Sequence, residues 1–203
     1  MTIYLVRHGE TNWNRQRRVQ GRENIHLNAS GKRQAELCGR ALVPLGIDCI
    51  LSSPLQRAKK TAELIAAAVH VYPVRLDRRL IERDFGPLSG MTPVERRKMY
   101  LSGASIPLES RDNLIDRMLA VLADYSGRTF QNVVMVSHGA AINALLYVLS
   151  GGSAGTGKTV LKNGGISRID CTNGKMQICY CNRSPDEVAL PLPVPLAYPA
   201  YTY

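Results

Sequence analysis

The sequence is poor in aromatic residues and has no long hydrophobic run. Aromatic residues make up 6% of its 203 residues, with two Phe and one Trp. Basic residues are scattered without a long tract, and so few aromatic side chains leave little for base stacking, so nucleic acid is not an expected partner. No apolar run approaches the length that spans a membrane, so a membrane partner is not expected either.

Paired cysteines and a targeting segment are also missing. The five cysteines are an odd number without a C-x-x-C pair, which argues against a disulfide framework or a zinc knuckle. We expect them to be small core residues. The first residues, MTIYLVRHG, lack the basic leader, apolar segment and cleavage site of a signal peptide, which favours a cytoplasmic location.

The residues that are present indicate a globular protein with excess positive charge. Hydrophobic residues make up 45% and charged residues 21%, and the length suits one domain with a sizeable core. The formal net charge of +10 favours an anionic partner. Phosphorylated small molecules are one class of anionic partner that such a charge favours, and a merely solvated basic surface is the alternative.

Short apolar segments alternate with segments of helical periodicity. Residues 2–6 are typical of a strand buried on both faces, and 28–42 have helical spacing followed by Pro44 and Gly46. Ser53 is a predicted cap before a proline in a first helical turn, and TPVE at 92–95 is a predicted capping box. The alternation predicts an α/β fold with a mainly parallel central sheet. Further strands are expected at 49–52, 133–136, 167–171 and 176–181, and further helices at 112–125 and around 142–149.

The end of the chain has a different composition. The stretch SPDEVALPLPVPLAYPAYTY carries five prolines from Pro185 on, which favours extended, polyproline-like structure. Its Leu, Val and Tyr residues predict that it packs against this chain or a neighbour, which leaves a homodimer open. We therefore expect a main domain at 1–184 and a proline-rich tail at 185–203.

One stretch imitates a nucleotide-binding loop. GGSAGTGKT at 151–159 contains G-x-x-x-x-G-K-[ST], in which Lys158 would reach the outer phosphates. Such a loop joins a strand to a helix, whereas here a predicted helix precedes it and Gly164 and Gly165 stop any helix that would follow. Without a helix N-terminus to hold phosphate, the match is predicted to be a coincidence.

Two other stretches echo one another: LVRHG at 5–9 and MVSHG at 135–139. Each is an apolar strand that runs into His-Gly, and ligands of parallel sheets bind outside the carboxyl ends of the strands. His8 and His138 are therefore expected in one crevice with Arg7. The segment SSPLQR delivers Arg57 to the same edge. A single strand-end His or surface Arg is usually structural, but this convergence favours an anion site.

These residue types suit a phosphoryl group. Arginine binds phosphate as a charged bidentate fork, and a neutral imidazole can attack phosphorus and carry it covalently. The leaving oxygen then needs a proton from a carboxylic acid. Glu82 in LIERDFGPLSG is the candidate, although spacing alone does not separate it from Glu10 or Asp84.

The chain resembles the histidine phosphatase superfamily, also called the phosphoglycerate mutase-like family. The resemblance rests on LVRHGETNWN, VQGRENIHLNASGKRQA, SSPLQRAKKTAE, ERDFGPLSG and VSHGAAI, which span most of residues 1–170 in the family's order. It implies a three-layer α/β/α sandwich with a small cap region, here within about 86–112, and it implies chemistry without a metal or cofactor.

The resemblance also assigns roles to residues. His8 becomes the nucleophile that forms phosphohistidine, and Glu82 becomes the proton donor. The chain departs from the family where Asn24-Ile25-His26-Leu27 replaces a frequent Asp-x-Pro-Leu, and we expect this to change the loop rather than the chemistry. The remaining implied residues are Arg7, Asn14, Arg57 and His138 for phosphate binding, and Gln20, Gly21, Arg83 and Gly139 for the substrate side.

The predicted function is hydrolysis of a phosphomonoester through phosphohistidine, acting on a small phosphorylated metabolite. Phosphoglycerate mutase is the first alternative, because Glu82-Arg83 resembles the Glu-Arg pair of mutases, whose arginine helps bind the substrate carboxylate. The second alternative is a catalytically weak anion-binding or regulatory protein that uses the same pocket. The sequence does not name the phosphorylated substrate.

Overall fold

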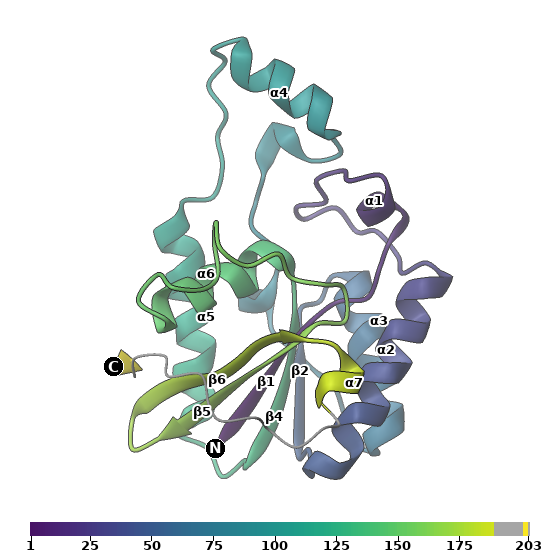
Figure 1. Ribbon diagram of the computed structural model, residues 1–203, viewed down its shortest axis with the longest axis vertical. Coiled ribbons are helices and arrows are strands. Elements are labelled where there is room, and N and C mark those ends of the chain that lie inside the picture. Colours follow the sequence, from purple (N-terminus) through teal and green to yellow (C-terminus); the bar gives the residue numbers. More distant parts are fainter. Residues whose placement is uncertain (189–200, 203) are drawn as a thin grey trace.

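A computed structural model describes residues 1–188, 201 and 202, which form a seven-stranded sheet with helices on both faces (Figure 1). The strand order is β3-β2-β4-β1-β5-β6-β7. The first four in this order run parallel, and each of the last three is antiparallel to the strand before it. The strands are β1 (Thr2–Arg7), β2 (Cys49–Ser52), β3 (Arg75–Leu76), β4 (Asn132–Ser137), β5 (Ile166–Thr172), β6 (Lys175–Arg183) and β7 (Tyr201–Thr202).

Successive residues of the central strands point into two separate hydrophobic clusters. Ile3 and Leu5 of β1 lie in one cluster, whereas Tyr4 and Val6 lie in the other. Side chains alternate across a strand, so each central strand contributes to the core on both faces of the sheet. This burial explains why the sequence of these strands is continuously apolar instead of alternating.

The helices cover the two faces of the sheet (Figure 1). Residues of α2 and α3 pack in the cluster that contains Tyr4, and residues of α5 and α6 pack in the cluster that contains Ile3. The predicted three-layer α/β/α sandwich with a mainly parallel central sheet is therefore confirmed. These helices are α2 (Ala29–Leu42), which η1 (Val43–Leu45) follows, α3 (Gln56–Val69), α5 (Arg111–Ser126) and α6 (Gly139–Leu149).

The predicted cap of α3 is wrong. The helix begins at Gln56 after Leu55, whose side chain makes no capping hydrogen bond. The Ser53 hydroxyl instead lies 2.8 Å from Nε2 of His138, and the N–H of Gln56 donates to Oδ1 of Asn24 at 2.8 Å. A distant loop thus satisfies this helix end, and local sequence gives no signal for such a partner.

Two segments extend past the carboxyl ends of the parallel strands, at the top of Figure 1. The first carries the short helix α1 (Asn12–Arg15). The second lies between η2 (Arg78–Leu80) and α5, and it contains η3 (Gly86–Leu88) and α4 (Pro93–Leu101). The capping box predicted at the start of α4 is present, with Thr92 and Glu95 exchanging hydrogen bonds.

The chain after β6 begins with a helix, so the extended structure predicted from Pro185 on is wrong for its first residues. The helix α7 (Pro185–Val188) follows Ser184, whose N–H donates to Oε2 of Glu187 at 2.6 Å. Val188 is buried in the cluster that contains Tyr4, and β7 pairs with β6. The rest of the predicted tail, 189–200 and 203, lies outside the described residues.

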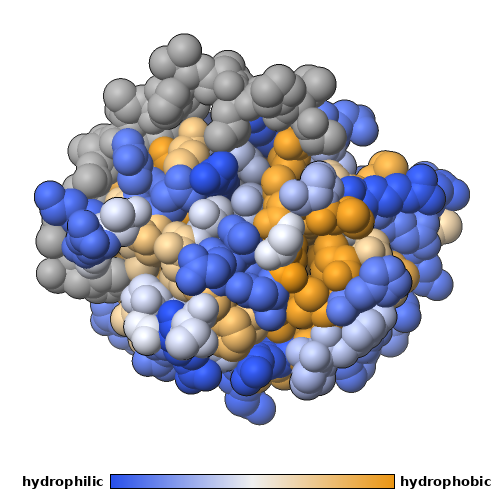
Figure 2. Space-filling model, turned by 90° about the horizontal axis from the view of Figure 1, so that it is seen from below, coloured by the Kyte–Doolittle hydropathy of each residue, from blue (hydrophilic) through white to orange (hydrophobic). Residues whose placement is uncertain are grey.

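The face at the amino ends of the central strands carries many hydrophilic residues, with hydrophobic residues gathered between them (Figure 2). Among the described residues, no helix has the length and apolar character that crossing a membrane requires. None of the five cysteines, all in the described part of the chain, forms a disulfide, and Cys38 and Cys49 are buried as expected. The polar residues singled out in the sequence lie at the opposite end of the sheet.

Candidate active site

The carboxyl ends of β1, β2 and β4 bring the two histidines and two arginines together. Arg7 ends β1 and precedes His8, Arg57 is the second residue of α3, and His138 is the N-cap of α6. The His8 and His138 ring centroids are 5.1 Å apart. Since His8 is 2% exposed and both Arg57 and His138 are 0% exposed, the fold holds these polar groups inside the protein.

Hydrogen bonds assign the tautomer of His8. Its Nδ1 lies 2.7 Å from the carbonyl oxygen of Gly9, so Nδ1 carries the proton and donates it. Nε2 therefore keeps its lone pair and accepts a hydrogen bond from Nε of Arg57 at 3.2 Å. A side chain at Gly9 would collide with the backbone of Gly31, so glycine is required for this close approach. The result is a fixed imidazole with an available lone pair.

Arg57 is fixed by two backbone carbonyls in addition to His8. Its Nη1 donates to the carbonyl oxygen of Glu23 at 2.6 Å, and its Nη2 donates to that of Gly21 at 2.7 Å. Both carbonyls belong to the first extended segment, so the guanidinium also holds that segment over the sheet. Gly21 has φ +49°, in the region that favours glycine.

Two buried donors beside this cluster have no partner within the described part of the protein. The Ser53 hydroxyl lies 2.8 Å from Nε2 of His138 and accepts from the N–H of Leu55. In the tautomer in which this hydroxyl donates to Nε2, Nδ1 of His138 carries a proton and is buried without an acceptor, as is Nε of Arg7. Buried donors that lack an acceptor are costly, and an anion bound here would satisfy them.

The carboxylate of Glu82 lies at the N-terminus of α6. Its Oε2 accepts from the N–H of Ala140 at 3.1 Å, and its Oε1 accepts from Ala141 at 3.0 Å and from Arg83 at 2.9 Å. Because His138 gives α6 no side-chain cap, Glu82 satisfies the first free N–H groups of this helix. The carboxylate is thereby held by the N–H groups of the residues two and three positions after His138.

The other two acidic candidates are used elsewhere. Oε1 of Glu10 accepts from Nδ2 of Asn28 at 2.7 Å, at the start of α2. Asp84 accepts from the N–H of Gly86 and pairs with Arg22 at 3.2 Å. Of the three carboxylates that spacing alone left open, Glu82 is the one that accepts from the N-terminus of the helix that follows His138.

The site is electrostatically positive and its two imidazoles are buried. Burial, with the charges of Arg57 and Arg7, holds the pKa of His8 well below its usual value of 6.5. Burial also holds the pKa of His138 well below that value, and Arg57 and His8 add to the shift. Burial lowers the pKa of Arg57 to about 10, which leaves it charged at neutral pH. Neutral imidazoles therefore stand among permanent positive charges.

We expect His8 and His138 to stay neutral as the pH falls through 6.5. Their folded pKa values lie below the unfolded value, so protonation of the folded protein begins only at lower pH. Titration of the imidazole ¹⁵N shifts by NMR checks this, and the unfolded protein, in which histidines titrate near about 6.5, is the reference. A midpoint at or above 6.5 for both buried rings would contradict the assignment.

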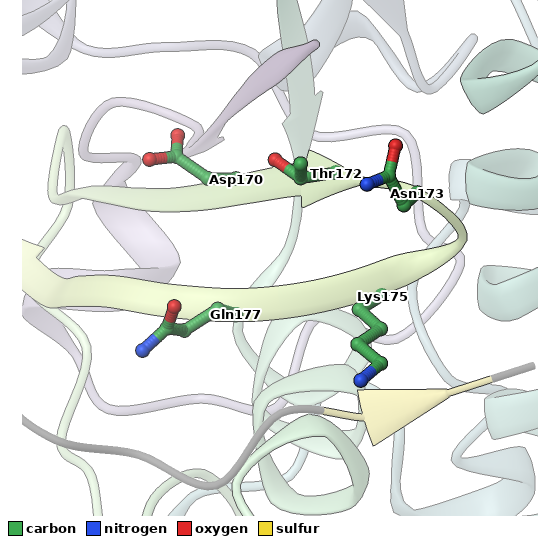
Figure 3. A pocket seen from close by; sticks show the side chains of 5 residues that line it. All are labelled: Asp170, Thr172, Asn173, Lys175 and Gln177. Carbon is green, nitrogen blue, oxygen red and sulfur yellow. The ribbon is translucent and has the colours of Figure 1, made fainter.

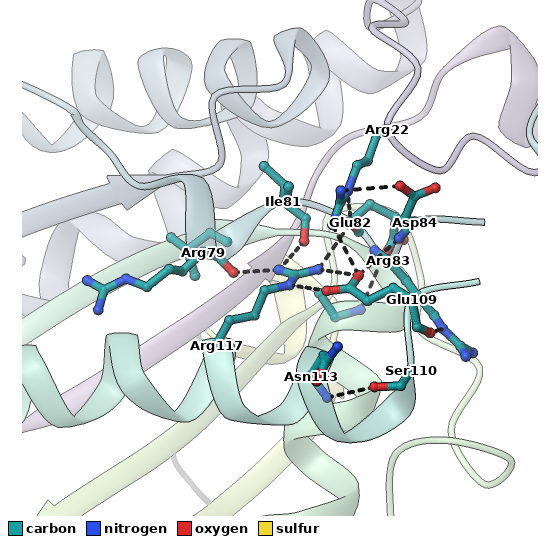
Figure 4. A network of polar contacts seen from close by, with 12 residues as sticks. Arg22, Arg79, Ile81, Glu82, Arg83, Asp84, Glu109, Ser110, Asn113 and Arg117 are labelled. Atoms are coloured by element: carbon teal, nitrogen blue, oxygen red, sulfur yellow. Dashed lines mark hydrogen bonds and ion pairs between the residues drawn. The ribbon is translucent and has the colours of Figure 1, made fainter. Parts of the chain in front are cut away.

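A buried network supports the backbone on either side of Glu82 (Figure 4). Arg117 of α5 donates from Nη1 to the carbonyls of Arg79 and Ile81 at 2.5 and 2.7 Å. Its Nη2 donates to the carbonyl of Glu82 at 3.1 Å. Glu109 pairs with Nε of Arg117 at 2.7 Å and accepts the N–H of Asp84 at 3.0 Å. The network joins the two ends of the segment that carries α4.

The remaining predicted residues surround this centre in different ways. Oδ1 of Asn14 accepts from Thr11 as part of the α1 capping box. Gln20 is buried with Oε1 unpartnered. Arg83 donates from Nε to the carbonyl of Glu109 at 2.8 Å. Gly139 begins α6, and a Cβ there would lie 3.5 Å from Nε of Arg7.

Three residues of the site were missed by the sequence reasoning. Asn163 donates from Nδ2 to the carbonyl of His8 at 3.0 Å, and Thr61 accepts the N–H of Gly9 at 3.1 Å. Ser53, which was expected to cap a helix, is the partner of His138. Ser53 and Thr61 adjoin the segment of Arg57, which was a usable signal, whereas Asn163 lies far from every other site residue in the sequence.

A concave region at the β5–β6 hairpin contains none of these groups. A pocket of about 290 Å³ is lined by residues of the β5–β6 hairpin, from Asp170 to Gln177 (Figure 3). Its side chains come from the antiparallel part of the sheet, on strands that carry none of the site residues. Within the described residues, no group of three or more His, Cys, Asp or Glu side chains could hold a metal ion.

The stretch that imitates a nucleotide-binding loop follows α6 and precedes β5, with no helix between Thr159 and Ile166. The absence of a following helix agrees with the prediction that the pattern match is a coincidence. Thr159 Oγ1 accepts the N–H of Gly155 at 2.9 Å, and Lys158 is exposed. The hydroxyl that would bind magnesium in a nucleotide-binding loop here closes a local turn.

We expect Lys158→Ala to leave turnover of phosphate esters within about twofold of wild type, as for most exposed positions away from a site. ATP should bind no more tightly than other phosphate esters, because no helix N-terminus faces this lysine. Calorimetric titration with ATP and magnesium tests this. Tight, magnesium-dependent binding that disappears in the variant would restore the nucleotide-binding interpretation.

Comparison with known proteins agrees with this geometry. The family model described as histidine phosphatase superfamily (branch 1) matches residues 3–184. The chain belongs to this superfamily. The predicted family is thus confirmed, and the match covers β1, β2, β4 and the helices that deliver His8, Arg57 and His138.

The relatives of this chain include proteins named as phosphatases and proteins named as mutases. This chain is 41% identical over 178 residues to the uncharacterized phosphatase PhoE of Bacillus subtilis (strain 168), and the match covers 87% of this chain and 91% of PhoE. It is 39% identical over 183 residues to the probable phosphoglycerate mutase GpmB of Salmonella paratyphi B, covering 84% and 85%.

A solved structure with the same fold is the phosphoserine phosphatase of Entamoeba histolytica in complex with 3-phosphoglyceric acid. The TM-score is 0.77 at 29% identity, covering 93% of this chain and 99% of that one. The superfamily and the phosphatase relatives agree with the function predicted from the sequence.

Proposed function

We propose that this protein hydrolyses a small phosphomonoester through a phosphohistidine at His8, without a metal. The observation that carries the proposal is the neutral Nε2 lone pair of His8, aimed among buried arginines beside unsatisfied donors. A phosphoryl dianion placed there would accept from Nε of Arg7 and Nδ1 of His138. Asn14 adds a further donor, since its Oδ1 is held by Thr11 and its Nδ2 remains for the ligand.

In the first step, Nε2 of His8 attacks phosphorus and the bond from phosphorus to the ester oxygen breaks. The phosphoryl oxygens replace His8 as the acceptor for Nε of Arg57. As His8 gains positive charge, its Nδ1–H donates more strongly to the carbonyl of Gly9, 2.7 Å away. Glu82 gives its proton to the departing oxygen as this bond breaks.

In the second step, water attacks the phosphohistidine on the face that the product alcohol has left. The carboxylate of Glu82 takes the proton from this water, the bond between phosphorus and Nε2 breaks, and His8 returns to its neutral form. The three N–H groups that bind Glu82 in the free protein keep this carboxylate in place between the two steps.

Phosphoglycerate mutase is the second candidate, favoured by Arg83 next to Glu82 and by the GpmB relatives. A mutase must exclude water from the phosphoenzyme, which calls for an enclosing cap. The cap proposed here, about 86–112, contains one nine-residue helix, α4, in which no residue is buried. An exposed helix of this size leaves water access to His8, so hydrolysis is expected to prevail.

The test compares two activities in one preparation that has been treated with EDTA. We expect release of free phosphate from phosphate esters to exceed interconversion of 2- and 3-phosphoglycerate by at least about tenfold, because an open pocket discharges the phosphoenzyme to water. Faster interconversion would make the protein a mutase with a cap that closes. Activity that disappears with EDTA and returns only with zinc or magnesium would reject the metal-free mechanism.

A further inference from the structure

A second pocket of about 290 Å³ adjoins the carboxylate of Glu82. It lies between α5, α6 and the loop after α6, and Arg83, Arg111, Asn143 and Thr156 are among its lining residues. Ala140 also lines it, and the N–H of Ala140 donates to Oε2 of Glu82 at 3.1 Å. The proposed proton donor therefore stands at the junction between this pocket and the phosphoryl site.

The pocket has two arginines and no acidic partner for them among the described residues. The Arg111 guanidinium lies 3.6 Å from the centroid of the Tyr147 ring, and its Nε is buried without a hydrogen-bond partner. Arg83 donates from Nε to a backbone carbonyl. The carboxylate of Glu82 is held by three backbone N–H groups, and that of Glu109 is paired with Arg117 and Arg22. Two uncompensated guanidinium groups in one pocket favour an anionic ligand group.

Asn143 supplies the opposite kind of group. Its Nδ2 donates to the carbonyl of Thr159 at 3.0 Å, which fixes the amide, while its Oδ1 is buried without a partner. An unpartnered buried acceptor calls for a hydroxyl or amine donor on the ligand. The pocket therefore contains two guanidinium groups and one hydrogen-bond acceptor, so it suits a ligand that carries both an anionic group and a hydrogen-bond donor.

The loop that imitates a nucleotide-binding motif forms one wall of this pocket. The N–H of Thr156 donates to the carbonyl of Asn143 at 3.0 Å. A side chain at Gly155 would collide with the backbone of Asn143 and Tyr147, so glycine at this position permits the loop to lie directly on α6. Gly155 thus lets this loop form one wall of the pocket that Arg111 lines.

We propose that this pocket receives the leaving group of the substrate, with Arg111 and Arg83 binding a carboxylate and Asn143 accepting from a neighbouring hydroxyl or amine. The proposal rests on the proposed function, because Glu82 must protonate the ester oxygen at the mouth of the pocket. It names the substrate class as phosphate esters of small hydroxy or amino acids. Arg111 is the residue that sets this specificity.

The experiment measures kcat/KM of wild type and Arg111→Gln on four esters. O-phosphoserine and 3-phosphoglycerate carry a carboxylate, whereas glycerol 3-phosphate and p-nitrophenyl phosphate carry none. We expect Arg111→Gln to lower kcat/KM roughly tenfold or more for the two carboxylated esters, the size of a lost charge-assisted hydrogen bond, with little change for the other two. Asn143→Leu should lower kcat/KM for the three esters whose leaving group carries a hydroxyl or amine, which include glycerol 3-phosphate, with little change for p-nitrophenyl phosphate.

Arg128→Gln is the matched control, because Arg128 also lies over a tyrosine, 4.6 Å from the Tyr125 ring, at the far end of α5. It should behave as wild type on all four esters. An equal loss on all four esters in Arg111→Gln, or no loss on any, overturns the proposal. Inclusion of a bisphosphate adds a further arm, since preference for it over the carboxylated esters would assign the pocket to a second phosphate and reject the carboxylate.

Failure of the proposed function is separable from failure of this inference. If wild type releases phosphate from none of the esters, p-nitrophenyl phosphate included, the hydrolase proposal fails and the leaving-group pocket fails with it. If p-nitrophenyl phosphate is hydrolysed well but wild type shows no preference for the esters that carry a carboxylate over those that carry none, only the pocket assignment is wrong.

Discussion

His8→Ala is expected to abolish turnover, with a loss of at least about 10³-fold in kcat, because removal of a covalent nucleophile cannot be compensated by binding groups. No other side chain in the described structure presents a neutral imidazole lone pair to the arginines. His138 is the only nearby alternative, and its Nε2 is occupied by the hydroxyl of Ser53. Phosphate release from p-nitrophenyl phosphate is the direct measurement.

Trapping the phosphoenzyme gives a second readout for the same variant. Wild type quenched during turnover should carry protein-bound phosphate that is labile to acid, as expected for phosphohistidine, and His8→Ala should carry none. His26→Ala is the matched control, because His26 is exposed and lies outside the cluster of buried histidines. Wild-type activity in His8→Ala, or trapped phosphate that resists acid, would show that the nucleophile has been assigned to the wrong residue.

The variant should still fold and bind phosphate. Arg57 loses one acceptor, but the carbonyls of Glu23 and Gly21 keep the guanidinium in position. Arg7 and His138 retain their unsatisfied donors. Loss of turnover together with retained binding of inorganic phosphate would therefore separate a missing nucleophile from a collapsed site.

The strand ends of the site could be predicted because they depend on local sequence. Apolar runs that stop at His-Gly place His8 and His138 at the carboxyl edge of a parallel sheet. Ligands of such sheets bind outside this edge, which predicts that the two histidines share one site. The helix of Arg57 was also predicted, but its start was not. Its first N–H is satisfied by Asn24 from a separate loop, so the preference of Ser53 for a cap position was overridden by its contact with His138.

Contacts between distant segments were beyond reach of pattern and spacing. Arg117 and Glu109 read as ordinary helix-surface and loop charges, yet they hold the backbone around Glu82. Asn163 likewise reads as a turn residue, although it donates to the carbonyl of His8. Such roles depend on which loops meet in three dimensions, and a single sequence carries no periodic signal for that.

The choice among three acidic residues shows the same limit. All three acidic residues, Glu10, Glu82 and Asp84, lie near glycine in loops at the edge formed by the carboxyl ends of the parallel strands. Their local sequences therefore do not distinguish them. Only the position of the α6 N-terminus separates them, because its free N–H groups need an acceptor and Glu82 reaches them. Tertiary structure thus turns an ambiguous motif into one candidate proton donor.

Glu82→Gln is expected to slow hydrolysis of alkyl phosphates by about 10² to 10⁴-fold, the usual range for loss of a general acid. The amide keeps the shape of the side chain and an oxygen for the N–H groups of α6, so phosphate should still bind. It has no proton to give to a departing alkoxide. An ester whose leaving group is already a weak base, such as p-nitrophenyl phosphate, needs that proton less and should lose less.

The ratio between the two substrates is therefore more informative than either rate. A structural role for Glu82 as the cap of α6 would reduce both rates alike, because it would act through the shape of the site rather than through a proton. A role as proton donor predicts a steeper dependence of kcat on the pKa of the leaving group in Glu82→Gln than in wild type. Glu10→Gln is the matched control, since Glu10 contacts Asn28 away from α6. A series of aryl and alkyl phosphates measures both slopes, and parallel slopes would leave Glu82 as a helix cap and return the search for the acid to another residue.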